Sequence, residues 1–153
     1  MKMIVGGLAF VALLLAVALV GSLAMLASQS RSMSVPLGIR NGRLSDCPQT
    51  PNCVSSDAPQ TDDHYIAPIE DPAGTKWAVL IDRVGALNGA RIVETTDTYA
   101  RFEFASGLFG FVDDVELHRR PDAGQIAVRS ASRVGRGDLN ANRKRVEAIR
   151  RLI

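Results

Sequence analysis

The N-terminal segment constrains this chain most, because it holds a long run without any charged residue. The apolar run Ile4–Ala27 (IVGGLAFVALLLAVALVGSLAMLA) is 24 residues long, and a helix needs about 20 residues to cross the hydrocarbon core of a bilayer. The apolar region of a secretory signal peptide is shorter, at about 7–15 residues. The sequence therefore predicts a single-pass transmembrane anchor within residues 1–28. Cleavage after Ala24, at the small-residue site Ser22-Leu23-Ala24, is the alternative.

The rest of the chain divides into a short linker and one domain. Residues 29–43 are small, polar and glycine-containing, which is typical of a flexible linker. Residues 44–153 are about 110 residues, enough for one hydrophobic core and too few for a second. A multidomain enzyme, a repeat array and a polytopic transporter are therefore excluded.

The two cysteines bear on the compartment. Cys47 and Cys53 stand six positions apart across two prolines in DCPQTPNCVSS, which suits a small disulfide loop of the kind that persists in an oxidising environment. A zinc site needs about four ligands, and His64 and His118 do not have finger spacing. A redox pair is usually Cys-x-x-Cys. We expect a structural disulfide and no metal site, with free thiols or redox chemistry as alternatives.

The orientation of the anchor follows from the cysteines rather than from charge. Arg31, Arg40 and Arg43 follow the apolar run and only Lys2 precedes it, so the positive-inside rule alone would leave the N-terminal flank outside. The expected disulfide favours the opposite orientation, as does the usual inward insertion of short N-terminal signal segments. The prediction is a bacterial inner-membrane protein whose domain faces the periplasm, or a periplasmic protein if the segment is cleaved.

The first helix of the domain has marked ends in the sequence. Asp71 is suited to the N-cap, Pro72 to the first helical position, and Asn88-Gly89 to the C-terminal stop. Between them, apolar residues recur at helical spacing on one face: Trp77, Leu80, Ile81, Val84 and Leu87.

Strands follow, because the hydrophobic period changes from 3.6 to two. Four strands are predicted, at Arg91–Thr95, Thr98–Ala105, Phe111–Arg119 and Gln125–Ser130. Tyr65–Ile69 is predicted as a short edge strand, because Pro68 cannot donate to a ladder. A last helix spans Leu139–Ile153 after Asp138 as its cap, and its apolar stripe should pack on the sheet: Leu139, Val146, Ile149 and Ile153. The predicted fold class is α+β, an antiparallel meander of about four strands with two helices on one face, preceded by the transmembrane helix.

Three carboxylates on one predicted strand are the leading site candidates. With period two, Asp113 shares a face with Val115 and Leu117, while Asp114 and Glu116 share the other. An unpaired charge on the core side costs several kcal/mol in order-of-magnitude terms, so we expect Asp113 or Asp114 to pair with an arginine on or just after the next strand, Arg129 or Arg133. One interpretation is a structural carboxylate–guanidinium network. The other is a ligand or metal pocket built from Asp113, Asp114, Glu116, Arg129, Ser130, Ser132 and Arg133.

Three sequence blocks of the domain carry a family resemblance. They are CPQTPNCVSS, ARIVETTDTYARFEFASGLFGFVDDVELH and VRSASRVGRGDLNANRKRVEAIR, and together they resemble the DUF1499 family of uncharacterised proteins over residues 44–153. Bacterial members often carry an N-terminal membrane segment. The resemblance implies a domain boundary and assigns no chemistry.

The last helix is strongly basic, with Arg143, Lys144, Arg145, Arg150 and Arg151. We interpret these residues as a solvated face, with contact to anionic lipid or to an envelope protein as the alternative. A domain outside the cytoplasm does not meet nucleic acid.

No catalytic motif is present, since both Gly-x-Ser-x-Gly and Ser-x-x-Lys are lacking, and no cofactor is expected. The leading hypothesis is a membrane-tethered envelope protein, held through residues 4–27, whose domain binds an unknown ligand or partner without catalysis. One alternative is an enzyme that uses the Asp113/Asp114/Glu116 and Arg129/Arg133 cluster for acid–base or metal chemistry. A purely structural envelope protein is the other.

Overall fold

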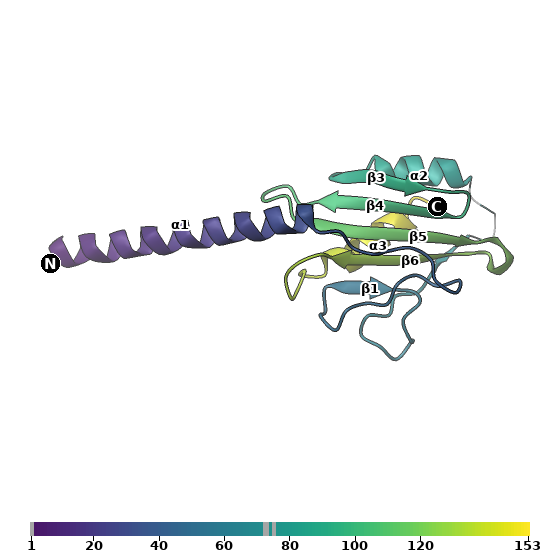
Figure 1. Ribbon diagram of the computed structural model, residues 1–153, viewed down its shortest axis with the longest axis horizontal. Coiled ribbons are helices and arrows are strands. Elements are labelled where there is room, and N and C mark those ends of the chain that lie inside the picture. Colours follow the sequence, from purple (N-terminus) through teal and green to yellow (C-terminus); the bar gives the residue numbers. More distant parts are fainter. Residues whose placement is uncertain (1, 72–73, 75) are drawn as a thin grey trace.

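A computed structural model describes residues 2–71, 74 and 76–153. A long N-terminal helix, α1 (Lys2–Ser32), projects from one end of an α+β domain (Figure 1). The helix is long and apolar enough to cross a membrane between Gly7 and Ser32. Most of its apolar side chains do not pack on the domain; Leu8 and Leu15, for example, are each 67% exposed.

The domain is built on an antiparallel sheet. Its strands are β1 (Cys53–Ser55), β2 (Ile69–Glu70), β3 (Ala90–Thr95), β4 (Tyr99–Ala105), β5 (Val112–Arg120) and β6 (Gln125–Ser132). The order is β1-β6-β5-β4-β3, and β2 also pairs with β6. The predicted four-stranded meander is therefore confirmed as β3 to β6, and two short strands extend it at β6. The predicted edge strand at Tyr65–Ile69 lies instead at Ile69–Glu70, while Tyr65 forms a single bridge with Ser55.

The first domain helix, α2 (Trp77–Gly85), is shorter than predicted at both ends. Lys76 is its N-cap, so the prediction that Asp71 caps it is wrong; Pro72 lies outside the described residues. The Asp71 backbone N–H instead donates to the carbonyl of Gly124 at 2.8 Å, which holds this residue at the β5–β6 turn. The turn itself is a short 3₁₀ helix, η1 (Pro121–Ala123).

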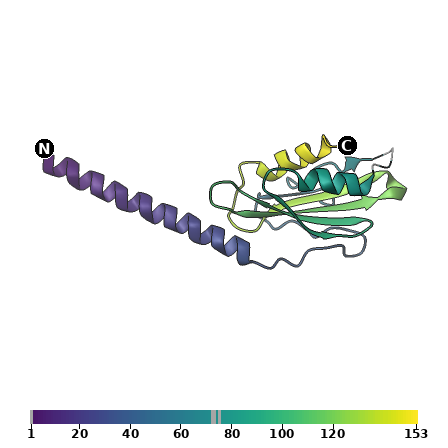
Figure 2. The ribbon, with the colours of Figure 1, turned by 90° about the horizontal axis from the view of Figure 1, so that it is seen from above.

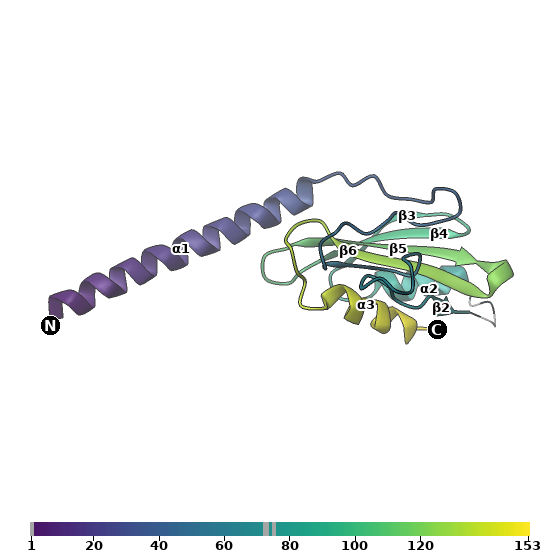
Figure 3. The same ribbon diagram turned by 90° about the horizontal axis from the view of Figure 1, so that it is seen from below.

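The second helix of the domain is α3 (Ala141–Arg150). Helices α2 and α3 cover the same face of the sheet, as Figures 2 and 3 show. Fully buried side chains fill the space between helices and strands, among them Leu80, Val84, Phe102, Val115, Leu117, Ile126, Val128, Val146 and Ile149. This arrangement matches the predicted apolar faces of β4, β5 and α2.

The predicted apolar stripe of the last helix is only half correct. Val146 and Ile149 are fully buried, but Leu139 is 92% exposed and Ile153 is 43% exposed. The reason is the length of α3, because Leu139 precedes the helix and Ile153 follows it. The N-cap of α3 is Asn140 rather than the predicted Asp138, although the Asp138 carboxylate accepts from the backbone N–H of Asn142 in the first turn at 2.8 Å.

The opposite face of the sheet is covered by residues 33–48, here called the covering segment (Figures 2 and 3). The Gly38 backbone N–H donates to Glu116 at 2.8 Å, and buried Leu44 packs with Tyr99 and Ala127. The stretch predicted as a linker, 29–43, thus consists of the last turn of α1 followed by chain that lies against the sheet.

The C-terminal end of α1 is fixed to the domain. Ala27 and Ser30 are fully buried. The Ser30 hydroxyl accepts from the Val112 N–H at 3.1 Å, and its carbonyl accepts from Arg133 at the same distance. Arg31 Nη1 donates to the carbonyl of Phe109 at 2.9 Å. The helix and the domain therefore share a small polar interface.

Candidate functional site

The sheet separates the seven predicted site residues into two groups, because successive side chains of a strand point to opposite faces. Asp113 and Ser132 are register partners and, with Ser130, contact α3. The second group lies on the face under the covering segment and comprises Asp114, Glu116, Arg129 and Arg133. The seven residues therefore do not form one site.

The group beside α3 is a polar cluster that joins this helix to the sheet. Asp113 Oδ2 accepts from Arg145 Nη2 at 2.6 Å, so its arginine partner comes from α3 rather than from β6. The buried Ser130 hydroxyl donates to Asn142 Oδ1 at 2.6 Å. The Asn142 amide donates to Ser132 Oγ at 3.0 Å. These groups satisfy one another, which indicates a structural role.

On the other face, Asp114 and Arg133 form the predicted ion pair. Arg133 donates through Nε and Nη2 to the two oxygens of Asp114, at 2.7 and 2.8 Å. The same guanidinium reaches Glu103 at 2.5 Å. The hydrogen bond to Asp114 is the largest cause that raises the pKa of Arg133. Burial alone would raise the pKa of Glu103, but hydrogen bonds from Arg133 and Arg91 outweigh it and lower that pKa.

Glu116 is fully buried beside this pair. Its Oε1 accepts from the Tyr99 hydroxyl at 2.9 Å and from the Gly38 N–H at 2.8 Å. Burial raises the pKa of Glu116 by more than these donors and the charge of Arg129 lower it. Burial also raises the pKa of Tyr99, with the charge of Glu116 as a second cause.

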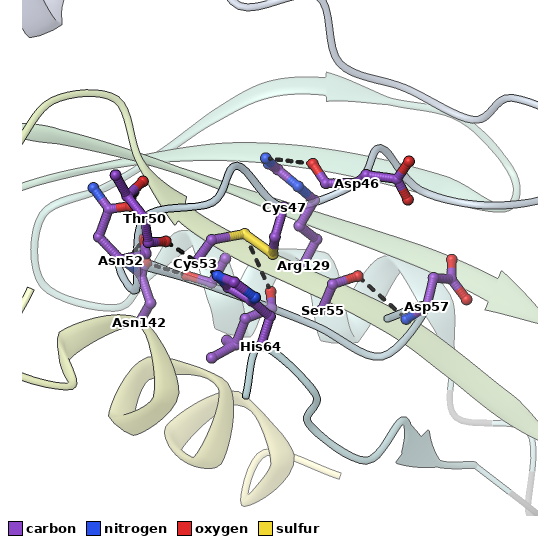
Figure 4. The surroundings of a disulfide bond; sticks show 12 residues. Asp46, Cys47, Thr50, Asn52, Cys53, Ser55, Asp57, His64, Arg129 and Asn142 are labelled. Atoms are coloured by element: carbon purple, nitrogen blue, oxygen red, sulfur yellow. Dashed lines mark hydrogen bonds between the residues drawn. A yellow bond between two sulfur atoms is a disulfide. The ribbon is translucent and has the colours of Figure 1, made fainter. Parts of the chain in front are cut away.

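Arg129 is the least satisfied member of the group. It is 5% exposed, and Nη1 reaches Glu116 Oε2 only at 3.4 Å. Nη2 reaches the carbonyl of Asp46 at 3.4 Å as well (Figure 4), whereas N–H···O bonds centre on about 2.9–3.0 Å. Its Nε has no hydrogen-bond partner among the described residues. The buried guanidinium of Arg129 therefore has N–H groups that can donate further hydrogen bonds.

A cavity of about 360 Å³ lies beside Arg129, between the covering segment and the end of β6. Its apolar wall is formed by Met33, Val35, Pro36, Leu37, Pro48 and Ala131. The charged side chains that line it are Asp114, Arg129, Arg133 and Asp46. The cavity therefore combines an aliphatic wall with an incompletely paired cation, and it is called the Arg129 cavity below.

The disulfide between Cys47 and Cys53 closes one side of this region (Figure 4). Cys53 begins β1, and Cys47 lines the Arg129 cavity. The bond therefore fixes the end of the covering segment to the sheet edge. The disulfide predicted from the cysteine spacing is confirmed.

His64 is engaged on both ring nitrogens. Nδ1 lies 2.7 Å from Asp62 Oδ1, and Nε2 lies 3.1 Å from the carbonyl of Thr50. Burial would lower the pKa of His64, but the hydrogen bonds to Asp62 and Thr50 outweigh it and raise that pKa. The ring holds two loop segments together. Over the described residues, no group of three His, Cys, Asp or Glu side chains is placed to hold a metal ion.

Three of the five basic residues of the last helix are structural contacts. Arg143 donates to the carbonyls of Asp63 and Tyr65, and Arg145 pairs with Asp113. Arg150 donates to the carbonyls of Pro68 and Ala67, at 2.6 and 2.8 Å. The basic face predicted from the sequence is therefore largely used to hold α3 against the loops and the sheet.

Two parts of the site are absent from the sequence prediction. The first is Tyr99. The period-two pattern of β4 puts Tyr99 on the same face as Glu103, so the alternation could have predicted that Tyr99 lies beside Glu116. The covering segment gave no such signal, because a backbone N–H at a glycine makes its contact with Glu116.

Comparison with known proteins adds the family. A family model described as "Protein of unknown function (DUF1499)" matches residues 43–153, the whole domain from the last part of the covering segment onward. No curated protein and no solved structure matches the chain significantly. The match covers well over half of the chain and agrees with the resemblance of its sequence blocks. The chain therefore belongs to the DUF1499 family.

Proposed function

We propose that this protein is a single-pass membrane-anchored binding protein whose domain lies in an oxidising compartment, the periplasm of a bacterial cell. The length and apolar surface of α1 support the anchor. The disulfide supports the compartment, because such bonds are rare where thiols are kept reduced.

We further propose that the Arg129 cavity binds a small molecule with one acidic group and a short aliphatic chain. The observation that carries this proposal is a buried arginine at the cavity wall whose Nε has no hydrogen-bond partner among the described residues. A buried donor left unsatisfied costs about 1–3 kcal/mol. A carboxylate or phosphate that accepts from Nε and one Nη would recover this cost, because guanidinium binds such anions through two parallel hydrogen bonds.

The charges around the cavity favour an anion over a cation. Both oxygens of Asp114 accept from Arg133, and both oxygens of Glu116 have donors. The carboxylates of Asp114 and Glu116 are therefore already compensated, and the remaining carboxylate, that of Asp46, is exposed to solvent. The Nε of buried Arg129, in contrast, has no acceptor among the described residues. The apolar wall, which includes Val35 and Leu37, suits an aliphatic chain, and the volume lies in the range of small-molecule sites, about 300–1,000 Å³.

The alternative of an enzyme rests on the raised pKa of Glu116, which suits a general acid. Its Oε1 already accepts from Tyr99 and Gly38, however, and Asp113 lies on the other face of the sheet. A purely structural protein, the other alternative, would bind no ligand in the cavity.

The test is thermal unfolding of the full chain in a mild non-ionic detergent. Hexanoate and hexyl phosphate serve as probes, and hexanol is the neutral control. We expect a saturable rise in Tm with at least one acidic probe and none with hexanol. Arg129→Gln should abolish the rise, whereas Arg91→Gln, which removes the same charge from a largely exposed side chain, should retain it.

A second variant separates ligand binding from loss of fold. Ala131→Leu keeps Arg129 and narrows the cavity, since Ala131 lines it. It should weaken the probe-induced rise in Tm. A rise of equal size in the parent, Arg129→Gln and Ala131→Leu would contradict binding in this cavity, as would no rise with either acidic probe.

A further inference from the structure

We infer that two loops of the domain, Ser106–Phe111 between β4 and β5 and residues 133–140 between β6 and α3, insert into the membrane interface beside α1. They are called the membrane-facing loops below. The inference rests on the proposed membrane anchoring and is independent of the Arg129 cavity.

Both membrane-facing loops lie at the end of the domain from which α1 projects (Figures 1 and 3). The first loop is fixed to α1 by Arg31, which donates to the carbonyls of Phe109 and Gly110 at 2.9 and 3.3 Å. The second loop begins at Arg133, which donates to the carbonyl of Ser30. Their position relative to the helix is therefore set by hydrogen bonds.

Each loop presents a leucine to solvent. Leu108 is 85% exposed and Leu139 is 92% exposed, the two most exposed large apolar side chains of the domain among the described residues. A single exposed leucine needs no explanation. Two of them on the loops that flank a membrane-crossing helix form a surface that gains from contact with lipid.

The backbone at Leu139 supports a role for its exposed position. Its φ is 53°, a left-handed conformation that is uncommon for residues other than glycine. The chain thus holds a bulky apolar side chain outward in a conformation that a smaller or polar residue adopts more readily. The Lys144 ammonium donates a hydrogen bond to the backbone carbonyl of Leu139 at 3.3 Å.

The length of α1 places these loops at the boundary of the hydrocarbon core. About 20 helical residues cross the core, so a span that begins between Ile4 and Gly7 ends between Leu23 and Leu26. Leu23 and Leu26 are the α1 residues that line a groove of about 450 Å³ shared with Phe111, Val134 and Leu139. The groove is therefore at the depth where acyl chains meet headgroups.

The groove favours lipid as its occupant because one of its walls is the anchor helix itself. A groove continuous with the lipid-exposed surface of α1 meets acyl chains when the helix is in a bilayer. Arg31 and Arg136 are exposed at the same end of the domain, where phosphate headgroups of an anionic lipid would lie.

The test uses the full chain with a single labelled cysteine. Leu108→Cys and Leu139→Cys are each labelled with an environment-sensitive NBD dye. The native cysteines do not react because they form the disulfide. The control is Asp122→Cys in η1, an exposed site at the opposite end of the domain (Figure 1). Each protein is reconstituted into vesicles of phosphatidylcholine and phosphatidylglycerol.

We expect blue-shifted emission at 108 and 139, and strong quenching by lipids that carry a nitroxide near the headgroup. The label at 122 should keep water-like emission and escape quenching. Emission and quenching at 108 and 139 that match those at 122, in protein that floats with the vesicles, would overturn this inference alone. Protein that fails to float with the vesicles would overturn the membrane anchoring as well. Neither result bears on probe binding by the Arg129 cavity.

Discussion

At the scale of single residues, Arg133 and Arg129 are two buried arginines on the same face that differ in how fully they are paired. Arg133 makes hydrogen bonds of 2.5–2.8 Å to Asp114 and Glu103, whereas the bonds of Arg129 are 3.4 Å long. Removal of one partner of a buried pair leaves the other charge stranded. The two side chains should therefore respond differently to substitution.

Arg133→Ala should lower the free energy of unfolding by roughly 3–5 kcal/mol, because it strands Asp114. Arg91→Ala, which removes an exposed partner of Glu103, should cost less than about 1 kcal/mol. Urea unfolding followed by circular dichroism measures both. Equal losses in the two variants would show that the Asp114–Arg133 pair is not a main support of the fold.

Asp57 makes stability depend on pH. Burial raises the pKa of Asp57, but hydrogen bonds from Arg120 and from the Leu44 N–H, with the charges of Arg120 and Arg43, outweigh it and lower that pKa below 3.8. The carboxylate should therefore stabilise the fold fully above its unfolded pKa, and this contribution should disappear as pH falls through the lower folded pKa.

Asp57→Asn should consequently reduce the free energy of unfolding by roughly 1–3 kcal/mol at pH 7. The difference between parent and variant should shrink as the pH falls through and below 3.8. Urea unfolding across this pH range measures it. A difference that stays constant with pH would mean that the charge of Asp57 contributes nothing to stability.

At the scale of elements, the disulfide joins the covering segment to β1. The chain-entropy relation for a loop of this length gives about 2 kcal/mol of stabilisation, so the paired substitution of Cys47 and Cys53 by Ser should lower the free energy of unfolding by that amount. Mass spectrometry of alkylated, unreduced protein after export should find no labelled thiol. Labelling of both cysteines would contradict the disulfide in the cell.

The docking of α1 predicts that the helix stays in the mature protein. Ala27 and Ser30 are fully buried against the domain, only a few residues beyond the alternative cleavage site after Ala24. Signal peptidase would have to cut beside a segment that is packed and hydrogen-bonded. Amino-terminal sequencing and intact mass should therefore find the whole of α1, whereas a mature chain that begins at Met25 would refute its retention.

How much of these elements the sequence predicts depends on where the physical signal lies. Strands β4 and β5 were predicted well, because alternation alone assigns Phe102 and Val115 to the core and Asp114 to the other face. The start of α2 was predicted wrongly, because Asp71, a residue type that favours the N-cap, instead bonds to the β5–β6 turn through its backbone N–H. Leu139 was misassigned because helical spacing carries no information on where α3 begins.

The candidate site was less predictable than the fold. The acidic and basic partners on β5 and β6 follow from hairpin pairing, so the Asp114–Arg133 pair could be predicted. Asp113 pairs with Arg145 of α3, which depends on how a helix docks on the sheet rather than on any local pattern. The cavity wall comes from a segment whose composition is that of a linker.

At the scale of the whole molecule, the anchor, the membrane-facing loops and the Arg129 cavity are mechanically linked. Arg133 connects α1 to the sheet through the carbonyl of Ser30 and also lines the cavity. The covering segment follows directly from the end of α1 (Figure 2), and its residues line the cavity. A domain held by helix and loops would therefore keep the cavity in a fixed orientation to the bilayer.

The most direct test of the binding proposal observes the Arg129 side chain itself. In full chain labelled with ¹⁵N-arginine, the Nε–H signals of buried arginines are assigned from the spectra of Arg129→Gln and Arg133→Ala, and hexanoate is then titrated. The account predicts a saturable shift of the Arg129 signal, while that of Arg133, whose Nε donates to Asp114 at 2.7 Å, stays in place. An Arg129 signal that does not move, or that moves no more than that of Arg133, would contradict it.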